Sequence, residues 1–148
     1  MGRVEAIYIT PTHGEFPAPV ERVSAHAGAG LEGNRYYWDG RDAPAGRAVT
    51  LIAAEAVEAF ESESGTSLWP AETRRNVVTR GVDVNSLVGK RFRIGAVECE
   101  GVELCEPCAH LESMTRPGLI KGLVHRGGLN ADILVDGEIN VGDAITLA

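Results

Sequence analysis

The chain has 148 residues, of which 44% are hydrophobic, a fraction that is ordinary for a globular protein and too high for a disordered one. Its formal net charge of −7 argues against non-specific nucleic-acid binding, so an anionic ligand would need a local basic cluster. No apolar run approaches the roughly 18 residues of a membrane span, and the chain enters a strand pattern at Arg3 without the apolar core of a signal peptide. We therefore expect a single domain over residues 1–148, in the cytoplasm, with no membrane or nucleic-acid partner. Three cysteines without a secretory signal also fit a reducing compartment.

The first half of the chain reads as short strands separated by turns. Alternating or β-branched runs predict strands over residues 3–9, 20–25, 47–52 and 74–79. The glycine-rich stretch from Ala27 to Tyr36 matches no dinucleotide or phosphate-binding motif, so its glycine content alone predicts a surface loop. Residues 53–63 change to helical period, with Ala56, Val57 and Phe60 on one face.

The second half continues the same pattern. Strands are predicted over residues 90–94, 97–104, 129–135, 138–140 and 144–147, and short helical runs over 82–88, 108–112 and 116–124. Asp136-Gly137 is a hairpin turn signal between two of these strands. Because turns rather than regular helices separate the strands, the predicted fold class is mainly β, a closed or nearly closed β-barrel with a few peripheral helices.

A CxxC motif, Cys105-Glu106-Pro107-Cys108, lies between a predicted strand and a short predicted helix. Pro107 suits the first turn of a helix, which would place Cys108 where backbone N–H groups favour a thiolate. A thiolate can serve as a soft-metal ligand, a nucleophile or a sulfur carrier, whereas the alternative is a structural cysteine pair. Cys99 falls in mid-strand and is expected to be a small core residue.

Two other uses of the motif fit less well. Zinc could take Cys105, Cys108, His110 and His125, but no second CxxC exists and Cys108 and His110 are only two residues apart. A thioredoxin-like motif would need a flanking βαβ pattern that this chain lacks. We expect His110 to be a surface or structural residue, and His13 and His26 belong to no recognisable constellation.

Several stretches, in this order along most of the chain, resemble the MOSC domain, the C-terminal module of molybdenum cofactor sulfurases that also occurs in amidoxime-reducing enzymes and in small stand-alone bacterial proteins. The stretches are Gly30-Leu31-Glu32-Gly33-Asn34-Arg35-Tyr36, residues 47–52 with Glu55, Arg75-Asn76-Val77-Val78-Thr79-Arg80-Gly81, residues 88–95, Cys105 to Cys108, Gly127-Gly128-Leu129-Asn130-Ala131 and residues 137–143. The chain departs from the family at Asn34, where the family usually has Asp, so a carboxylate that could pair with Arg35 is lost.

The resemblance implies a β-barrel-centred fold of the pyruvate kinase β-barrel type and a cysteine, Cys108 by its position in the motif, that carries sulfur or ligates molybdenum. It also implies the molybdenum cofactor, molybdopterin, as the ligand, with a small-molecule substrate and a pyridoxal-phosphate-dependent cysteine desulfurase as a sulfur donor; the chain itself shows no pyridoxal-phosphate site. The implied function is sulfur transfer to a metal centre or molybdenum-dependent reduction of N-hydroxylated compounds. The alternative is a non-catalytic barrel that binds a small anion or a partner and has structural cysteines.

The candidate site residues follow from what such a cofactor needs: a soft thiolate for the metal, arginines for the phosphate and open backbone for the pterin edges. Cys108 is the expected metal ligand and catalytic residue, and His125, in a glycine loop, is the expected proton donor. The expected cofactor-binding residues are Gly33, Arg35, Arg47, Arg75, Asn76, Arg126 and Gly127.

Overall fold

The computed structural model describes residues 2–115 and 117–148. Its strands are β1 (Gly2–Ile9), β2 (Ala18–Val20), β3 (Arg22–His26), β4 (Gly30–Leu31), β5 (Val49–Ala53), β6 (Val77–Arg80), β7 (Arg91–Ile94), β8 (Val97–Leu104), β9 (Leu129–Ile133), β10 (Gly137–Asn140) and β11 (Ala144–Leu147). Its helices are α1 (Ala54–Ser64), η1 (Pro70–Thr73), η2 (Val84–Leu87), α2 (Ala109–Met114) and α3 (Leu119–Leu123), of which η1 and η2 are 3₁₀ turns.

Seven of the strands in the described part of the chain close into a barrel. They follow the order β11-β7-β8-β9-β5-β6-β1, and β1 pairs back with β11, while β2 adds to β1 outside the ring. Within this ring, β5 and β6 pair in parallel, because α1 and η1 form the crossover between them, as a parallel pair requires. The predicted mainly β barrel is thereby confirmed.

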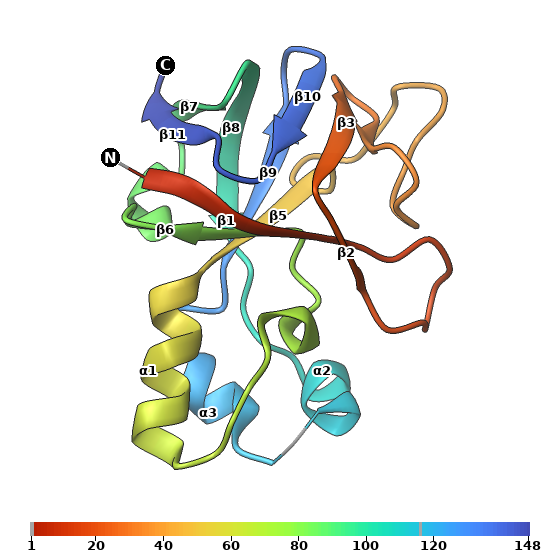
Figure 1. Cartoon of the computed structure of the whole chain (residues 1–148). Helices are drawn as coiled ribbons and strands as arrows, with labels where there is room; N and C mark the ends of the chain where they lie inside the picture. Colours follow the sequence, from red (N-terminus) through yellow and green to blue (C-terminus); the bar gives the residue numbers. More distant parts are fainter. Residues whose placement is uncertain (1, 116) are drawn as a thin grey trace.

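A second, three-stranded sheet runs in the order β10-β3-β4 and lies beside the barrel on the right of Figure 1. The predicted strand over residues 20–25 is therefore divided: β2 joins the barrel and β3 joins this sheet. The predicted hairpin at Asp136-Gly137 was wrong, because β9 pairs with β5 and β8 while β10 pairs with β3. The side chain of Asp136 accepts a hydrogen bond from the backbone N–H of Ala27, and this contact holds the turn against the end of β3.

Hydrophobic residues form two cores. The barrel interior is filled from alternate positions of its strands, as in β7, where Phe92 and Ile94 are buried and the two arginines between them are exposed. The second core lies where α1, α3 and α2 gather at one end of the barrel, and it contains Val57, Phe60 and Leu123. This arrangement leaves the connections at that end of the barrel free to shape a pocket.

The helices agree with the sequence pattern within a few residues. The helix α1 ends at Gly65, which adopts the left-handed conformation (φ 71°) that glycine tolerates and donates its N–H to the carbonyl of Glu61. The helix α3 begins at Leu119; Arg116, where the predicted helix starts, lies outside the described residues. None of the helices built from described residues has the length and apolar character needed to cross a membrane.

The glycine-rich stretch differs from the expected surface loop. Ala29 and Leu31 are buried, and Gly30-Leu31 forms β4 against β3. Gly30 has a φ of 121°, and a Cβ atom there would meet the carbonyl oxygen of Tyr36 at 2.8 Å, so this crossing of two backbones requires glycine.

Candidate functional site: a pocket lined by cysteines and arginines

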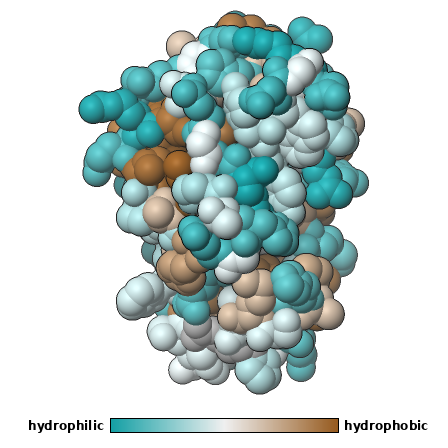
Figure 2. All heavy atoms as spheres, turned by 90° about the vertical axis from the view of Figure 1, so that its right-hand side faces the viewer, coloured by the Kyte–Doolittle hydropathy of each residue, from teal (hydrophilic) through white to brown (hydrophobic). Residues whose placement is uncertain are grey.

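A cavity of about 330 Å³ lies where the CxxC segment leaves the barrel. The loop after β1, the segment after β4, the entry to β5, the η1–β6 junction and the β8–α2 connection all contribute to its wall. Its lining residues are His13, Gly14, Asn34, Arg35, Tyr36, Gly46, Arg47, Thr50, Arg74, Arg75, Asn76, Glu103, Cys105, Glu106, Cys108, His110, Leu111, Met114 and Asn130. Figure 2 shows the side of the molecule where α2 and the loop after β1 lie, and the middle of this face is hydrophilic.

Cys108 is exposed and opens onto this cavity. It is the N-cap of α2 in an extended conformation, and its sulfur accepts a hydrogen bond from the N–H of Leu111 at 3.4 Å. Pro107, expected in the first helical turn, instead precedes the N-cap and is buried. A metal or an electrophile in the cavity can therefore reach the Cys108 sulfur without unfolding the helix.

The other two cysteines have different environments. Cys105 is partly buried, and burial raises the pKa of its thiol, although the nearby guanidinium groups of Arg75 and Arg47 oppose the shift. Cys99 is fully buried in β8, and burial raises its pKa to about 12. Cys105 and Cys108 are both free thiols. The motif is thus built as one open thiol beside a recessed one rather than as a disulfide pair.

Arg35 and Arg74 make the cavity cationic in an acidic chain. The guanidinium of Arg35 lies 4.6 Å from the centre of the Tyr36 ring, and its Nε is buried without a hydrogen-bond partner among the described residues. Burial and the nearby charge of Arg35 lower the pKa of Arg74. A buried N–H without an acceptor is costly, so this wall is suited to receive an anion.

Arg75 lines the cavity, but its guanidinium is hydrogen bonded to backbone carbonyls of the protein itself. Its Nε donates to the carbonyl of Gly127 at 2.8 Å, Nη1 to Thr73 at 3.2 Å, and Nη2 to Cys105 at 3.0 Å and Glu106 at 3.4 Å. These bonds join the start of β6 to the CxxC segment and to the glycine loop before β9. Arg75 therefore shapes the wall that carries the cysteines.

Asn76 also has a structural set of contacts. Its Oδ1 accepts from the N–H and the hydroxyl of Thr50, and its Nδ2 donates to the carbonyl of Tyr8. Asn34, the residue that departs from the family pattern, is buried, and its Oδ1 accepts from the N–H of Thr10 at 2.8 Å. An amide oxygen serves that bond as a carboxylate would, so the substitution keeps the local fold.

The structure brings together Cys108, Arg35, Arg47, Arg75 and Asn76 of the residues expected at the site. The remaining four do not line the cavity: Gly33, His125, Arg126 and Gly127.

The side chain of His125 is 77% exposed, and its Nδ1 lies 2.7 Å from Glu106, which does line the cavity. Arg126 pairs with Glu63 in the last turn of α1. Gly127 packs behind the motif, where a Cβ atom would lie 2.6 Å from the carbonyl oxygen of Cys105.

Several charged or titratable residues in the cavity were not among the sequence candidates, and two of them, Arg74 and His110, bear on its chemistry. Arg74 adopts a left-handed conformation (φ 61°) at the end of η1, and its Nη2 donates to the carbonyl of Glu15. Its position next to Arg75-Asn76 was the only signal in the sequence. His110, expected to be a surface or structural residue, is exposed and lines the cavity from the first turn of α2.

The zinc alternative requires several ligands in one place. Among the described residues, no group of three or more His, Cys, Asp or Glu side chains is arranged to hold a metal ion.

Comparison with known proteins identifies the class. The family model described as the MOSC domain matches residues 25–146, so the chain belongs to the MOSC family. The YuaD protein from Bacillus subtilis has a similar crystal structure, with a TM-score of 0.83 at 17% identity over 98% of this chain and 94% of that chain.

The crystal structure of YiiM from Geobacillus stearothermophilus is also similar, with a TM-score of 0.77 at 15% identity over 100% of this chain and 75% of that one. YiiM from Escherichia coli gives a TM-score of 0.70 at 19% identity over 99% and 69% of the two chains. At these identities the likeness shows a shared fold. A search of curated proteins finds no match.

Proposed function

We propose that this protein binds the molybdenum cofactor, with the Cys108 thiolate as its ligand to molybdenum. The observation that carries the proposal is the meeting of an open thiol and a cationic wall in one cavity: Cys108 on one side, and Arg35, whose buried Nε lacks an acceptor among the described residues, with Arg74 on the other. Thiolates suit soft metals, and arginine suits phosphate. Membership of the MOSC family, which is associated with this cofactor, supports the same ligand.

The residues around the cavity fit such a group. Arg35 and Arg74 would hold its phosphate, with Arg47 at the exposed rim. Tyr36 would border the bound group at the wall; its ring stacks on Trp38, with ring centres 6.1 Å apart and planes 11° from parallel, and lies 4.6 Å from the Arg35 guanidinium. When bound, the cofactor would supply two-electron redox chemistry and an acceptor for sulfur.

The protein's own groups would then have distinct tasks. Cys108 would hold the metal or carry sulfur, and His110 would exchange a proton from the first turn of α2. His125 does not line the cavity, so its proposed role as a proton donor would pass through Glu106, to which its Nδ1 is hydrogen bonded. Arg75 and Asn76 would keep the wall in place rather than bind the cofactor.

Two activities use this arrangement. In the first, the Cys108 thiolate attacks the outer sulfur of a persulfide on a cytoplasmic cysteine desulfurase. The S–S bond of the donor breaks, the desulfurase leaves as a thiolate and Cys108 becomes a persulfide, with no net oxidation. In the second, the N–O bond of an N-hydroxylated small molecule would break with uptake of two electrons and two protons, giving the N–H compound and water; an external electron-transfer protein would supply the electrons through the cofactor, and His110 could deliver a proton.

Reconstitution with cofactor tests the proposal and separates the two activities. Wild-type protein, Cys108→Ser and the matched control Cys105→Ser are compared for molybdenum content, persulfide labelling after exposure to a desulfurase, and reduction of an N-hydroxylated amidine. We expect Cys108→Ser to lose its molybdenum and its persulfide labelling, while Cys105→Ser keeps the wild-type values. Equal molybdenum content and equal persulfide labelling in wild type and Cys108→Ser would overturn the role of this cysteine.

A second candidate is a non-catalytic barrel that binds a small anion. It is favoured by the fact that two expected cofactor contacts, Arg75 and Asn76, are committed to the scaffold. This candidate predicts that an anion such as sulfate binds near Arg35 while no molybdenum is retained and Cys108→Ser changes nothing.

A further inference from the structure

One wall of the pocket is a single segment, residues 32–47, which follows β4. Asn34, Arg35 and Tyr36 line the cavity near its start, and Gly46 and Arg47 line it near its end. The middle of the segment, residues 37–45 around Arg41, does not line the cavity. Contacts that fix the middle of this segment therefore help to set the positions of Arg35 and Arg47 in the pocket wall.

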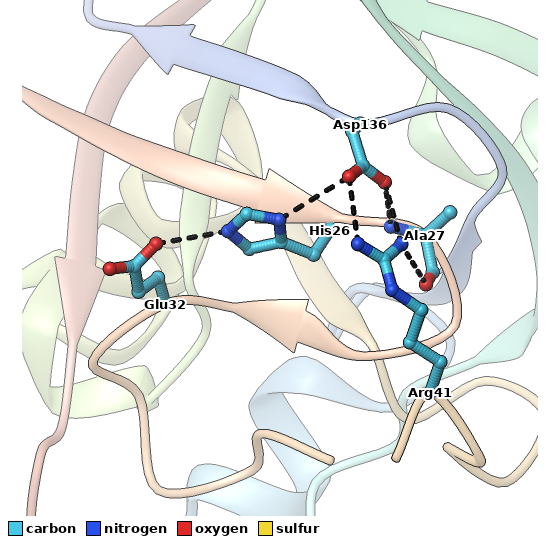
Figure 3. A network of polar contacts seen from close by, with 5 residues as sticks. All are labelled: His26, Ala27, Glu32, Arg41 and Asp136. Carbon is cyan, nitrogen blue, oxygen red and sulfur yellow. Dashed lines mark hydrogen bonds and ion pairs between the residues drawn. The ribbon is translucent and has the colours of Figure 1, made fainter. Parts of the chain in front are cut away.

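The middle of the segment is fastened to the second sheet by Asp136 (Figure 3). The carboxylate of Asp136 accepts two hydrogen bonds from the guanidinium of Arg41, both at 3.0 Å, and one from the N–H of Ala27 at 2.7 Å. Arg41 also donates to the carbonyl of Ala27 at 3.1 Å. The N–H of Ala43 donates to the carbonyl of Gly28, a second link between this segment and the turn that follows β3.

His26 joins this cluster to the start of the segment. Its imidazole lies between two carboxylates: Nε2 is 2.9 Å from Glu32 Oε2 and Nδ1 is 3.4 Å from Asp136 Oδ2. Glu32 stands three residues before Arg35. The ring of Tyr37 meets the imidazole edge-on, with centres 5.9 Å apart.

We propose that His26, Asp136 and Arg41 form a positioning cluster for the pocket's arginine wall, and that anion binding in the pocket weakens when His26 loses its proton. The imidazolium bridges the two carboxylates, whereas the neutral ring can donate to one of them only. Loss of that bridge loosens the segment at the end from which Arg35 projects. None of these three residues lines the pocket, so they act through the backbone.

The sign of the pH effect follows from the groups that face His26. The hydrogen bond to Glu32 is the largest cause that raises the pKa of His26 above its ordinary value of 6.5; burial opposes it, and Asp136 adds to the rise. Arg41 lowers the pKa of Asp136 and has its own pKa raised in return, so both stay charged above pH 5. A raised pKa in the folded state means that the bridge is complete below pH 6.5 and is lost as the pH rises through the higher, folded value.

Hydrogen exchange tests the positioning role without any ligand. Exchange of residues 35–47 is measured from pH 6 to pH 9, corrected for intrinsic rates, in wild type, His26→Gln and a control, Arg93→Gln, which removes an exposed ion pair with Glu98 on the barrel. We expect protection to fall with pH in wild type and control and to be independent of pH in His26→Gln. The same pH course in all three proteins, or none in wild type, would overturn the proposal.

Sulfate binding tests the link to the pocket. Sulfate stays a dianion over this range, and its binding is followed at the Arg35 Nε–H resonance by NMR. We expect its dissociation constant to rise about two- to fivefold between pH 6 and pH 9 in wild type, the size typical of an exposed ion pair.

The variant His26→Lys, which keeps a positive charge at this position throughout, should lose less affinity for sulfate between pH 6 and pH 9 than wild type does. Equal weakening in wild type and His26→Lys would contradict the role of the imidazolium. Because neither experiment uses the molybdenum cofactor, their outcome is separate from that of the proposed function.

Discussion

Arg75 donates from Nη2 to the carbonyl oxygen of Cys105 at 3.0 Å and thereby ties the start of β6 to the segment that carries the open thiol. The same guanidinium holds the carbonyl of Gly127. One side chain thus joins three parts of the chain that are distant in sequence, and it defines the back of the pocket.

Replacing Arg75 with Gln should therefore cost stability. The variant removes several charge-assisted hydrogen bonds to backbone carbonyls, and we expect a loss of about 2–4 kcal/mol in the free energy of unfolding. Urea denaturation followed by circular dichroism measures it. The matched control is Arg47→Gln, an exposed arginine of the same pocket, which should change stability by less than about 0.5 kcal/mol. Equal effects of the two variants would contradict a structural role for Arg75.

Replacing Arg35 should lower anion affinity while leaving stability nearly unchanged, the opposite of the result expected for Arg75. Because its Nε has no acceptor among the described residues, Arg35→Gln removes a cation without breaking a bond made by that atom. We expect sulfate affinity to fall about tenfold or more, with a change in unfolding free energy below about 1 kcal/mol. Calorimetric titration with sulfate checks the first value and urea denaturation the second. An unchanged affinity would show that the anion binds elsewhere.

Gly127 should not tolerate a side chain, although it lies outside the cavity. A Cβ atom there would meet the carbonyl oxygen of Cys105 at 2.6 Å and the ring of Pro107 at 2.9 Å. Gly127→Ala should therefore displace the CxxC segment and cost about 1–3 kcal/mol. Gly14→Ala is the control. Gly14 has open space around it, so this variant should lose stability mainly through backbone strain at its φ of 89° and not through steric overlap. Wild-type stability in Gly127→Ala would contradict the close packing.

The three cysteines should react with iodoacetamide in a fixed order. Cys108 is exposed and should react first; burial raises the pKa of Cys105, so less of it is thiolate at pH 7.5 and it should react more slowly. Cys99, with a pKa of about 12, should stay unlabelled in the native protein. Mass spectrometry of peptides after timed labelling gives the order. Faster labelling of Cys105 than of Cys108 would contradict the described environments.

Local signals in the sequence predicted much of the fold. The strand over residues 97–104 has the bounds that its alternation and the preceding turn indicated, and the helix after β5 follows from its helical period and from Gly65. The predicted hairpin at Asp136-Gly137 was wrong because the turn signal is local. The position of this turn depends instead on contacts of Asp136 with Ala27 and Arg41, which lie far away in the sequence.

The site was predictable only in part for the same reason. The motif order indicated Cys108 and Arg35, and both face the cavity. The sequence could not show that Arg75 donates its hydrogen bonds to backbone carbonyls or that Arg74 lines the pocket. Both orientations depend on the backbone conformation at the end of η1. His26, which belonged to no recognisable constellation, has partners 6 and 110 residues away along the chain.

The most direct measurement is the molybdenum content of protein reconstituted with the cofactor and then desalted, in wild type, Cys105→Ser and Cys108→Ser. We predict close to one molybdenum per chain in wild type and in Cys105→Ser, and almost none in Cys108→Ser, because Cys108 is the thiol that opens onto the arginine-lined pocket. Retention of the metal in Cys108→Ser at the wild-type level would contradict the central claim.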